Sequence, residues 1–423
     1  MRIEVGRVTR RAVGEDTPAL LTSKPERFAF AGLMLFAMVA ATFLQNGIAV
    51  LTPFLSREFD LSPGQLGLLG TVIYVAAALT SPRAGALVDV LGGRRIAMVL
   101  FVLSASALFA FSAAPSYAWL LFTVAFGGLA LATGNPVTNH LLSTHIAPGQ
   151  RGLLVGIKQS GVKVSQFLTG AILPAAALTL GWRTALRLAA IVILAGAVVA
   201  YLRIPPSPRG RHAGRRIRGR REPLGPTVWR LAAFAALMGT GSSAVNFHLP
   251  LYAFDHLALD ERTAGLTVGV MGLIGVFARV AWGPAAERFR SPSLPLVILS
   301  VGAVTAQSLV WASDTVGLFL LWIGVVGLGL TAAVWNTVAN YAIITTAGRQ
   351  TGRASGVLQT AFVLGLSVGP VSFGAAVEAT GSYHIGFAGV TAAFTLAALV
   401  AAQWWRTARP VDGDEQKGGS TTP

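Results

Sequence analysis

Long apolar runs separated by short polar segments dominate the chain from Phe28 to Trp405. Each run has about 18 residues or more, enough to cross the hydrocarbon core of a membrane as a helix at about 1.5 Å per residue. The pattern therefore predicts an all-α membrane protein with twelve transmembrane helices. They are expected at residues 28–54, 64–88, 96–113, 117–141, 152–180, 184–203, 227–256, 263–287, 294–312, 315–344, 352–379 and 384–405.

A polar segment at residues 204–226 divides the twelve predicted helices into two sets of six. The first run is too long for a cleavable signal peptide and follows a charged tail, so we interpret it as a retained first helix. The predicted organisation is a tail at 1–27, a six-helix bundle at 28–203, a basic linker at 204–226, a second bundle at 227–405 and a tail at 406–423.

Composition supports a membrane protein, because only 12% of the 423 residues are charged and 53% are hydrophobic, whereas soluble domains are about 25% charged. The lack of cysteine excludes disulfides and thiolate metal sites. The net charge of +16 is spread over both tails, the linker and alternate loops. By the positive-inside rule, this predicts a cell-membrane protein with cytoplasmic termini, and it argues against nucleic acid as a partner. The linker is interpreted as a topology determinant, with binding to anionic lipid headgroups as the alternative.

The two halves share an internal repeat. The sequence NPVTN at 135–139 reappears as NTVAN at 336–340, an offset of 336 − 135 = 201 positions. Gln159 and Gln359 are 359 − 159 = 200 positions apart. Two parallel repeats related by an axis along the membrane normal are typical of secondary transporters, whose site lies between the halves at the midplane.

One motif occurs after the second predicted helix and again after the eighth. The first copy is GALVDVLGGRR at 85–95 and the second is GPAAERFR at 283–290. This pattern resembles the signature loop of the major facilitator superfamily, and the resemblance covers the whole chain. It implies two six-helix bundles with pseudo-twofold symmetry, a monomer and alternating access.

The same motif predicts a gate at the cytoplasmic side. A carboxylate at a helix end can accept hydrogen bonds from the N-terminal amides of a helix in the other half, and its charge favours the positive end of that helix. Such contacts would hold the cytoplasmic side shut in one state and break in the other. The alternative is that these charges only fix topology. The predicted gating residues are Gly85, Asp89, Arg94, Arg95, Arg279, Gly283, Glu287 and Arg288.

The fifth predicted helix contains two lysines in the stretch GIKQSGVKVSQF at 156–167. At about 1.5 Å per residue, Lys158 lies roughly 9 Å from the cytoplasmic end and Lys163 roughly 17 Å. Lys158 is close enough to extend to the interface, but Lys163 is not. A charge facing lipid at that depth costs at least about 2.5–3.5 kcal/mol. We therefore expect Lys163 to face a cavity, the alternative being a lysine buried between helices as polar glue.

No acidic residue occurs in the middle of any predicted helix. Cations without matching carboxylates suit an anionic substrate, which brings its own counter-charge. The resemblance implies that further amide side chains lie on helices that line the cavity, where each could bind the solute or hydrogen-bond another helix. Coupling to a proton through His248 or Lys163 and uncoupled uniport are both open. The expected substrate-binding set is Lys163, Gln159, Gln166, Asn46, Asn135, Asn139, Asn246, His248, Asn336, Asn340 and Gln359.

No nucleotide-binding loop, nucleophile elbow or His-Glu-x-x-His motif occurs, so the sequence predicts neither an ATP-driven pump nor an enzyme. No metal or cofactor is expected, and the partners are membrane lipids and a small-molecule substrate. The function predicted from the sequence is secondary transport of a small organic anion. A drug or metabolite exporter is the alternative within transport, and a non-transporting receptor or scaffold is the alternative outside it.

Overall fold

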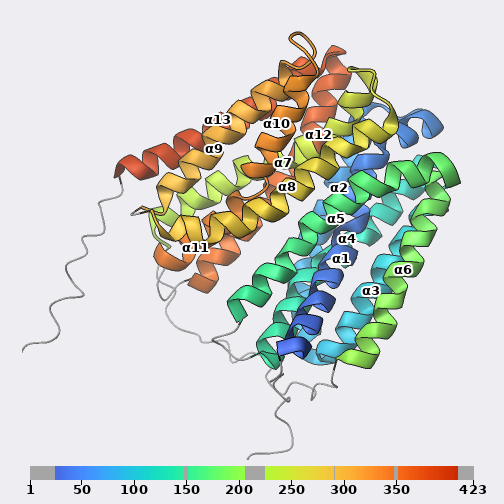
Figure 1. Cartoon of the computed structure of the whole chain (residues 1–423), viewed down its shortest axis with the longest axis vertical. Helices are drawn as coiled ribbons and strands as arrows, with labels where there is room; N and C mark the ends of the chain where they lie inside the picture. Colours follow the sequence, from blue (N-terminus) through green and yellow to red (C-terminus); the bar gives the residue numbers. More distant parts are fainter. Residues whose placement is uncertain (1–23, 147–150, 205–223, 290, 347–350, 408–423) are drawn as a thin grey trace, which may run out of the picture.

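The computed structural model describes residues 24–146, 151–204, 224–289, 291–346 and 351–407. Those residues form thirteen α-helices and no β-strand (Figure 1). The first bundle consists of α1 (Lys24–Phe59), α2 (Pro63–Leu91), α3 (Gly93–Ser112), α4 (Tyr117–His145), α5 (Arg151–Leu180) and α6 (Trp182–Arg203). The second consists of α7 (Pro226–Asp255), α8 (Glu261–Glu287), α9 (Ser293–Trp311), α10 (Phe319–Leu330), α11 (Trp335–Thr346), α12 (Thr351–Thr380) and α13 (Tyr383–Thr407).

Every predicted transmembrane segment coincides with a helix or a helix pair. The first helix begins at Lys24, inside the expected N-terminal tail, and most of the expected linker lies outside the described residues. Among the described residues, eleven segments are long and apolar enough to cross a membrane. The thirty-residue helix α7 is not one of them, because its middle is rich in Gly, Ser and Thr and also carries Asn246 and His248.

The tenth predicted helix is not continuous, which corrects the expectation of one helix at 315–344. It is broken between α10 and α11, where the chain makes turns at residues 331–334. The break leaves main-chain carbonyls available for other helices. Ser242 on α7 donates to the Ala332 carbonyl at 3.4 Å, and Arg279 on α8 donates to the Ala333 carbonyl at 3.2 Å. Neighbouring helices thus supply partners for irregular backbone within the membrane, as the lack of water there requires.

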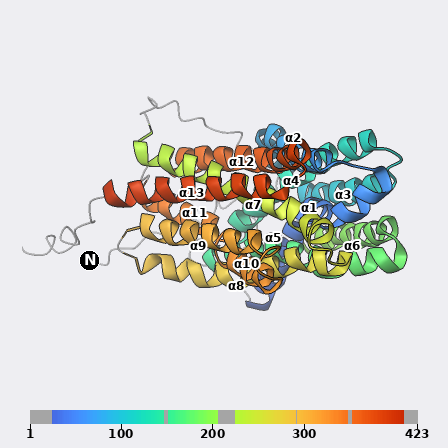
Figure 2. The same cartoon turned by 90° about the horizontal axis from the view of Figure 1, so that it is seen from above.

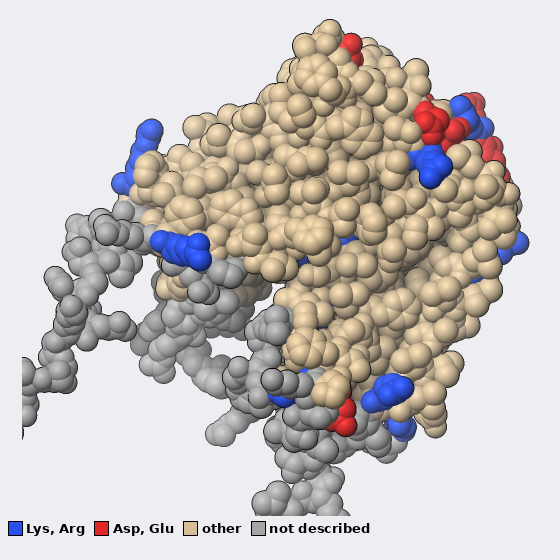
Figure 3. Space-filling model, in the orientation of Figure 1, with Lys and Arg blue, Asp and Glu red and all other residues tan. Residues whose placement is uncertain are grey.

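Each bundle is packed around its own apolar core. Aromatic side chains such as Phe101 and Phe111 are fully buried in the first core, and Phe234 and Phe394 in the second. On the face seen in Figure 3, acidic side chains lie only near the two ends of the bundles, and a broad band between them carries none. This distribution suits a surface in contact with lipid hydrocarbon.

Both described chain ends, Lys24 and Thr407, lie at the same end of the helices, which we call the terminal end. We call the opposite end, with the turns that follow α1 and α7, the loop end. The two bundles pack side by side (Figure 2) and diverge toward the terminal end (Figure 1). The two bundles are therefore in closer contact near the loop end than near the terminal end.

Glycines set the contact between the bundles near the loop end. A Cβ at Gly170 on α5 would lie 2.2 Å from the Gly269 amide nitrogen on α8, and one at Gly67 on α2 would lie 2.3 Å from the Pro370 carbonyl oxygen on α12. Small residues let helix backbones approach this closely. At the loop end itself, Arg57 also forms an ion pair with Glu261 of the other bundle.

Toward the terminal end, the same two interfaces open. Gly156 on α5 and Gly356 on α12 are exposed, and a Cβ added at either would meet no atom within 4 Å. Gln359, one turn from Gly356, is exposed as well. The bundles are therefore closed against each other at the loop end and parted at the terminal end.

Candidate functional site

Lys158 on α5 is completely buried, with an exposed fraction of 0%. Its Nζ donates hydrogen bonds to Asn135 Oδ1 at 3.0 Å, Thr138 Oγ1 at 3.0 Å and Asn139 Oδ1 at 2.7 Å, all on α4. Lys158 therefore does not extend to the interface, although its depth would allow this. The three acceptors lie within about one turn of α4. Their hydrogen bonds hold the side chain inside the bundle and replace those that water would give it at the interface.

The three acceptors around Lys158 match the three hydrogens of an ammonium group. The Thr138 hydroxyl donates its own hydrogen to the Gly134 carbonyl at 2.7 Å, so it can only accept from Lys158. A neutral amine has two hydrogens, whereas three acceptors require the three hydrogens of an ammonium. Lys158 is thus a buried cation whose donors are all used, and it orients Asn135 and Asn139.

Lys163 lies further along α5, between the bundles. Its Nζ donates to Gln166 Oε1 at 2.7 Å, and Gln166 Nε2 donates in turn to Asn246 Oδ1 on α7 at 2.7 Å. The methylenes of Lys163 pass Gly275 on α8, where an added Cβ would lie 3.2 Å from Cδ. The side chain therefore spans the interface of the two bundles, with one described acceptor for three ammonium hydrogens.

Arg279 follows Gly275 by one turn of α8, and its charge acts on Lys163. Its Nη1 donates to the Gln159 carbonyl on α5 at 3.1 Å, and its Nε donates to the Ala333 carbonyl at the α10–α11 break. Arg279 is therefore placed next to Lys163 and contacts both bundles. The sequence assigned it to the gate.

Lys163 and Arg279 thus lie together where the bundles meet, Lys158 lies five residues before Lys163 on α5 and bonds within the first bundle, and the described partners of all three are neutral. The acceptors are amides, a hydroxyl and main-chain carbonyls, and no carboxylate occurs among the described contacts of Lys158, Lys163 or Arg279. The sequence explains this, because it has no Asp or Glu at residues 117–180 or 263–286. The interface therefore carries an excess of positive charge.

The remaining amide residues of the expected site are distributed over several helices. Asn46 on α1 is buried and donates to Ser165 Oγ on α5 at 3.3 Å, which ties two helices of the first bundle. Asn340 Nδ2 donates to Asn336 Oδ1 on the same helix at 2.5 Å, and both side chains are half-buried. Gln359 is exposed on α12.

His248 on α7 lies at the other contact between the bundles, where α2 approaches α12. Its Nε2 donates to the Pro370 carbonyl on α12 at 2.8 Å, and its ring stacks on Phe373 with centroids 4.6 Å apart. The ring is 1% exposed. The structure thus connects His248 to the packing of α7 on α12, beside the close approach at Gly67.

The structure describes the side chains of four of the eight predicted gating residues. The side chains of Gly85, Asp89, Gly283 and Glu287 lie outside the described residues. The others lie at the terminal end apart from Arg279. Arg94 sits over the Tyr201 ring at 4.7 Å, and Arg95 and Arg288 are exposed.

Two residues of the cationic site were not singled out by the sequence. Thr138 lies inside the repeated motif at 135–139, so its position could have been inferred from its neighbours. The role of Gly275 could not be predicted from the sequence, because this glycine leaves room for the side chain of Lys163, which is more than one hundred positions away in the chain.

Comparison with known proteins agrees with this architecture. The sequence profile of the Major Facilitator Superfamily matches residues 34–370. An uncharacterized MFS-type transporter of Mycobacterium tuberculosis (strain ATCC 25618 / H37Rv) is 28% identical over 370 residues, covering 86% of this chain and 82% of that protein. A probable nitrate transporter of Staphylococcus epidermidis is 22% identical, covering 84% and 90%. The nitrite extrusion protein of Bacillus subtilis is 23% identical, covering 88% and 91%.

The fold also matches a solved structure. A bacterial homolog of the human lysosomal transporter Spinster, in an inward-facing and occupied conformation, superposes with a TM-score of 0.75 at 18% identity. The match covers 92% of this chain and 98% of that one. With 337 contiguous residues (370 − 34 + 1) spanned by the family profile and a two-bundle fold, this chain is a multi-pass membrane protein that belongs to the Major Facilitator Superfamily.

Proposed function

We propose that this transporter is a secondary transporter that moves a small anion across the cell membrane by alternating access. The observation that carries the proposal is the pair Lys163 and Arg279 between the bundles, with Lys158 nearby on α5 in the first bundle, and with only neutral described partners for all three. Unbalanced charge in a region of low dielectric is costly. An anion that enters the interface would supply the missing counter-charge.

The three cations have different roles in this proposal. Lys158 has all its donors in use, so it acts by positioning Asn135 and Asn139. Lys163 has hydrogens left for a ligand, and Arg279 has guanidinium hydrogens beyond its two carbonyl partners. Arginine presents donors in a planar fork that suits carboxylates and other oxyanions. Lys163 and Arg279 are therefore the proposed anion ligands, with Gln166 beside them.

The orientation follows from charge. The basic tails continue from Lys24 and Thr407 and the basic linker continues from Arg203, so by the positive-inside rule we propose that the terminal end faces the cytoplasm. The conformation described here would then be closed on the outside, through α5 with α8 and α2 with α12, and open to the cytoplasm. Transport requires the reverse arrangement as well, in which the glycine contacts near the loop end separate.

The substrate class that we propose is an organic anion with a carboxylate group. An inorganic oxyanion is the second candidate, and one observation favours it: relatives that match most of the chain are named as nitrate or nitrite proteins. Both substrate candidates would bind the same cationic side chains, so one experiment tests both. They differ in which anion stabilises the protein.

The test is ligand-induced thermal stabilisation of the purified protein. A panel would contain carboxylates, nitrate, nitrite, a neutral sugar and a cationic dye, measured on the wild type, Lys163→Ala and Arg406→Gln. The last variant removes an exposed positive charge at the terminal end and is the matched control. A ligand at one hundred times its Kd stabilises by about 2.7 kcal/mol.

We expect an anion to raise the melting temperature of the wild type and of Arg406→Gln but not of Lys163→Ala. Success of nitrate with failure of the carboxylates would select the second candidate. Stabilisation by the sugar or dye that persists in Lys163→Ala would contradict anion binding at this site and would favour an exporter of other solutes.

A further inference from the structure

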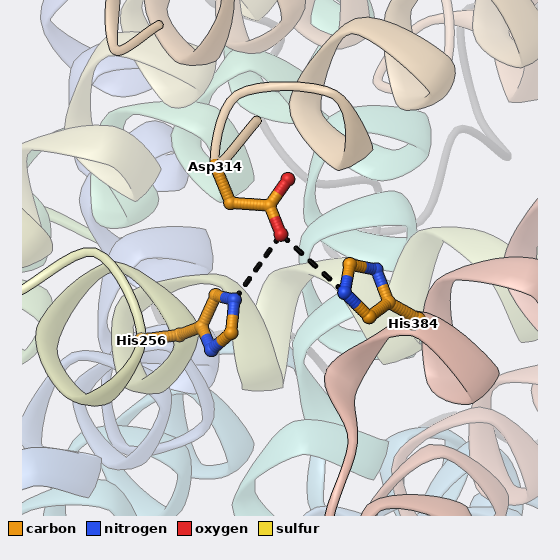
Figure 4. Close-up of side chains that lie close together, drawn as sticks. All are labelled: His256, Asp314 and His384. Carbon is orange, nitrogen blue, oxygen red and sulfur yellow. Dashed lines mark hydrogen bonds and ion pairs between the residues drawn. The ribbon is translucent and has the colours of Figure 1, made fainter. Parts of the chain in front are cut away.

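A second cluster of chemically active side chains lies at the loop end, far along the helices from the cationic site. His256 caps the C-terminus of α7, Asp314 lies in the turn between α9 and α10, and His384 is the second residue of α13 (Figure 4). The two imidazole rings point at the same carboxylate oxygen. Asp314 Oδ2 lies 3.2 Å from His256 Nε2 and 3.5 Å from His384 Nε2.

One carboxylate oxygen of the cluster has no described hydrogen-bond donor. Asp314 Oδ1 is buried and has no hydrogen-bond partner among the described residues. The carboxylate side chain is only 11% exposed, whereas the two histidines are 37% and 46% exposed. A carboxylate this enclosed requires a positive charge close by.

The spacing of the three atoms fits a metal ion. One ligand atom from each residue lies within 4.8 Å of the other two. An ion with bonds of about 2.0–2.1 Å in tetrahedral geometry separates its ligand atoms by roughly 3.4 Å, close to the two measured N–O separations. Two imidazoles and one carboxylate are a donor set that suits zinc and similar divalent ions.

Trp311 on α9 adds a specific constraint. Its indole Nε1 donates a hydrogen bond to His384 Nδ1 at 2.7 Å. An indole N–H can only donate, so Nδ1 is the acceptor and the ring proton of neutral His384 lies on Nε2. A metal on Nε2 requires this proton to move to Nδ1, where it would face the indole hydrogen. Metal binding would therefore break the Trp311 contact.

We propose that His256 Nε2, Asp314 Oδ2 and His384 Nε2 bind one divalent transition-metal ion such as Zn²⁺ at the loop end. The ion would place a divalent positive charge beside the enclosed Asp314 carboxylate and would tie together α7, the α9–α10 turn and α13. On binding, His256 and His384 each give up the hydrogen on Nε2 and carry their ring proton on Nδ1 instead, and Trp311 turns away. The site is independent of the anion site, since no residue is shared.

The experiment is calorimetric titration of the purified full-length protein, prepared without a polyhistidine tag, with ZnCl₂ and separately with MgCl₂. The variants are His256→Gln, Asp314→Asn and His384→Gln, with His140→Gln near the terminal end as the matched control. Folding of each variant is checked by its melting temperature without metal. If the buried Asp314 variant fails to fold, the exposed His256 variant decides.

We expect one Zn²⁺ per chain, no Mg²⁺ binding, and a loss of Zn²⁺ affinity above the roughly 10–100-fold typical of outer-shell changes in each ligand variant. Trp311→Phe keeps the ring but removes the opposing donor, so it should bind Zn²⁺ roughly 2–12-fold more tightly. The proposal is overturned if the wild type takes up no Zn²⁺, if His256→Gln and His384→Gln bind as the wild type does, or if Trp311→Phe binds more weakly.

Discussion

Gly170→Ala should shift this transporter away from the conformation that is closed at the loop end. The added Cβ would lie 2.2 Å from the Gly269 amide nitrogen, 2.5 Å from its Cα and 2.8 Å from the Gly265 carbonyl oxygen. These atoms belong to the backbone of α8 and cannot rotate aside, and ordinary contact needs at least about 3.4 Å. The two bundles must therefore separate by about 1 Å at this point or accept the clash.

The free-energy cost of Gly170→Ala in the closed conformation can be approximated. Overpacking of a close contact costs about 1–3 kcal/mol, and this penalty applies only in the closed arrangement. It therefore changes the ratio of the two conformations by roughly 5–150-fold. Helix propensity works in the opposite direction, since alanine is a better helix former than glycine. A change in conformation is thus expected without unfolding of α5.

The assay is the distance between two spin labels across the α5–α8 interface at the loop end. The chain contains no cysteine, so Thr179→Cys and Arg262→Cys would be its only labelled positions. Both are exposed and belong to different bundles. The matched control is Gly156→Ala, on the same helix but with no atom within 4 Å of its added Cβ.

We expect longer label distances in Gly170→Ala and an unchanged distribution in Gly156→Ala. An unchanged distribution in a folded Gly170→Ala protein would refute the argument that this glycine contact holds the loop end closed. A shift of equal size in both variants would refute it too, because the effect would then come from helix propensity.

Three further changes test other parts of the structure. Lys158→Met removes three hydrogen bonds worth about 0.6 kcal/mol each between membrane helices, so it should cost about 2 kcal/mol of stability, and an unaltered melting temperature would contradict the buried network. Gly275→Ala would crowd the methylenes of Lys163 and should weaken anion affinity by roughly tenfold, measured as the ligand concentration for half-maximal stabilisation. Asp260 caps α8, and hydrogen bonds from the hydroxyl and amide of Thr263 lower the pKa of its carboxyl below the usual 3.8. Because the folded pKa is the lower one, the cap stabilises fully above about pH 4 and loses this effect as the pH falls through the folded value, so Asp260→Ala should lower the melting temperature at pH 7 and by less at pH 3.

The fold could be predicted from the sequence to a large degree, because each membrane helix needs its own apolar run and the runs are cleanly separated. The break at residues 331–334 could not. Its sequence, TAAV, contains neither glycine nor proline, and the partners that stabilise the broken backbone, Ser242 and Arg279, come from helices elsewhere in the chain.

The candidate site was predicted in part. The polar face of α5 and the lack of acidic residues inside the helices are visible in the sequence, and they pointed to Lys163 and Gln166. The burial of Lys158 depends on the angle at which α4 packs against α5. The spacing of polar residues along α5 does not define this angle. The His256, Asp314 and His384 cluster also gave no motif, since its members are 58 and 70 positions apart (314 − 256 and 384 − 314) and meet only through the packing of the second bundle.

The most direct test of the central proposal is uptake of radiolabelled anions into vesicles that contain the wild type or Gln166→Glu. This change is nearly isosteric and places a carboxylate where Lys163 now contacts an amide oxygen at 2.7 Å. It would balance the charge of the site and compete with the substrate. We predict saturable uptake of an anion by the wild type and at least a tenfold loss in Gln166→Glu. Uptake of a neutral or cationic solute instead, unchanged in Gln166→Glu, would contradict the account.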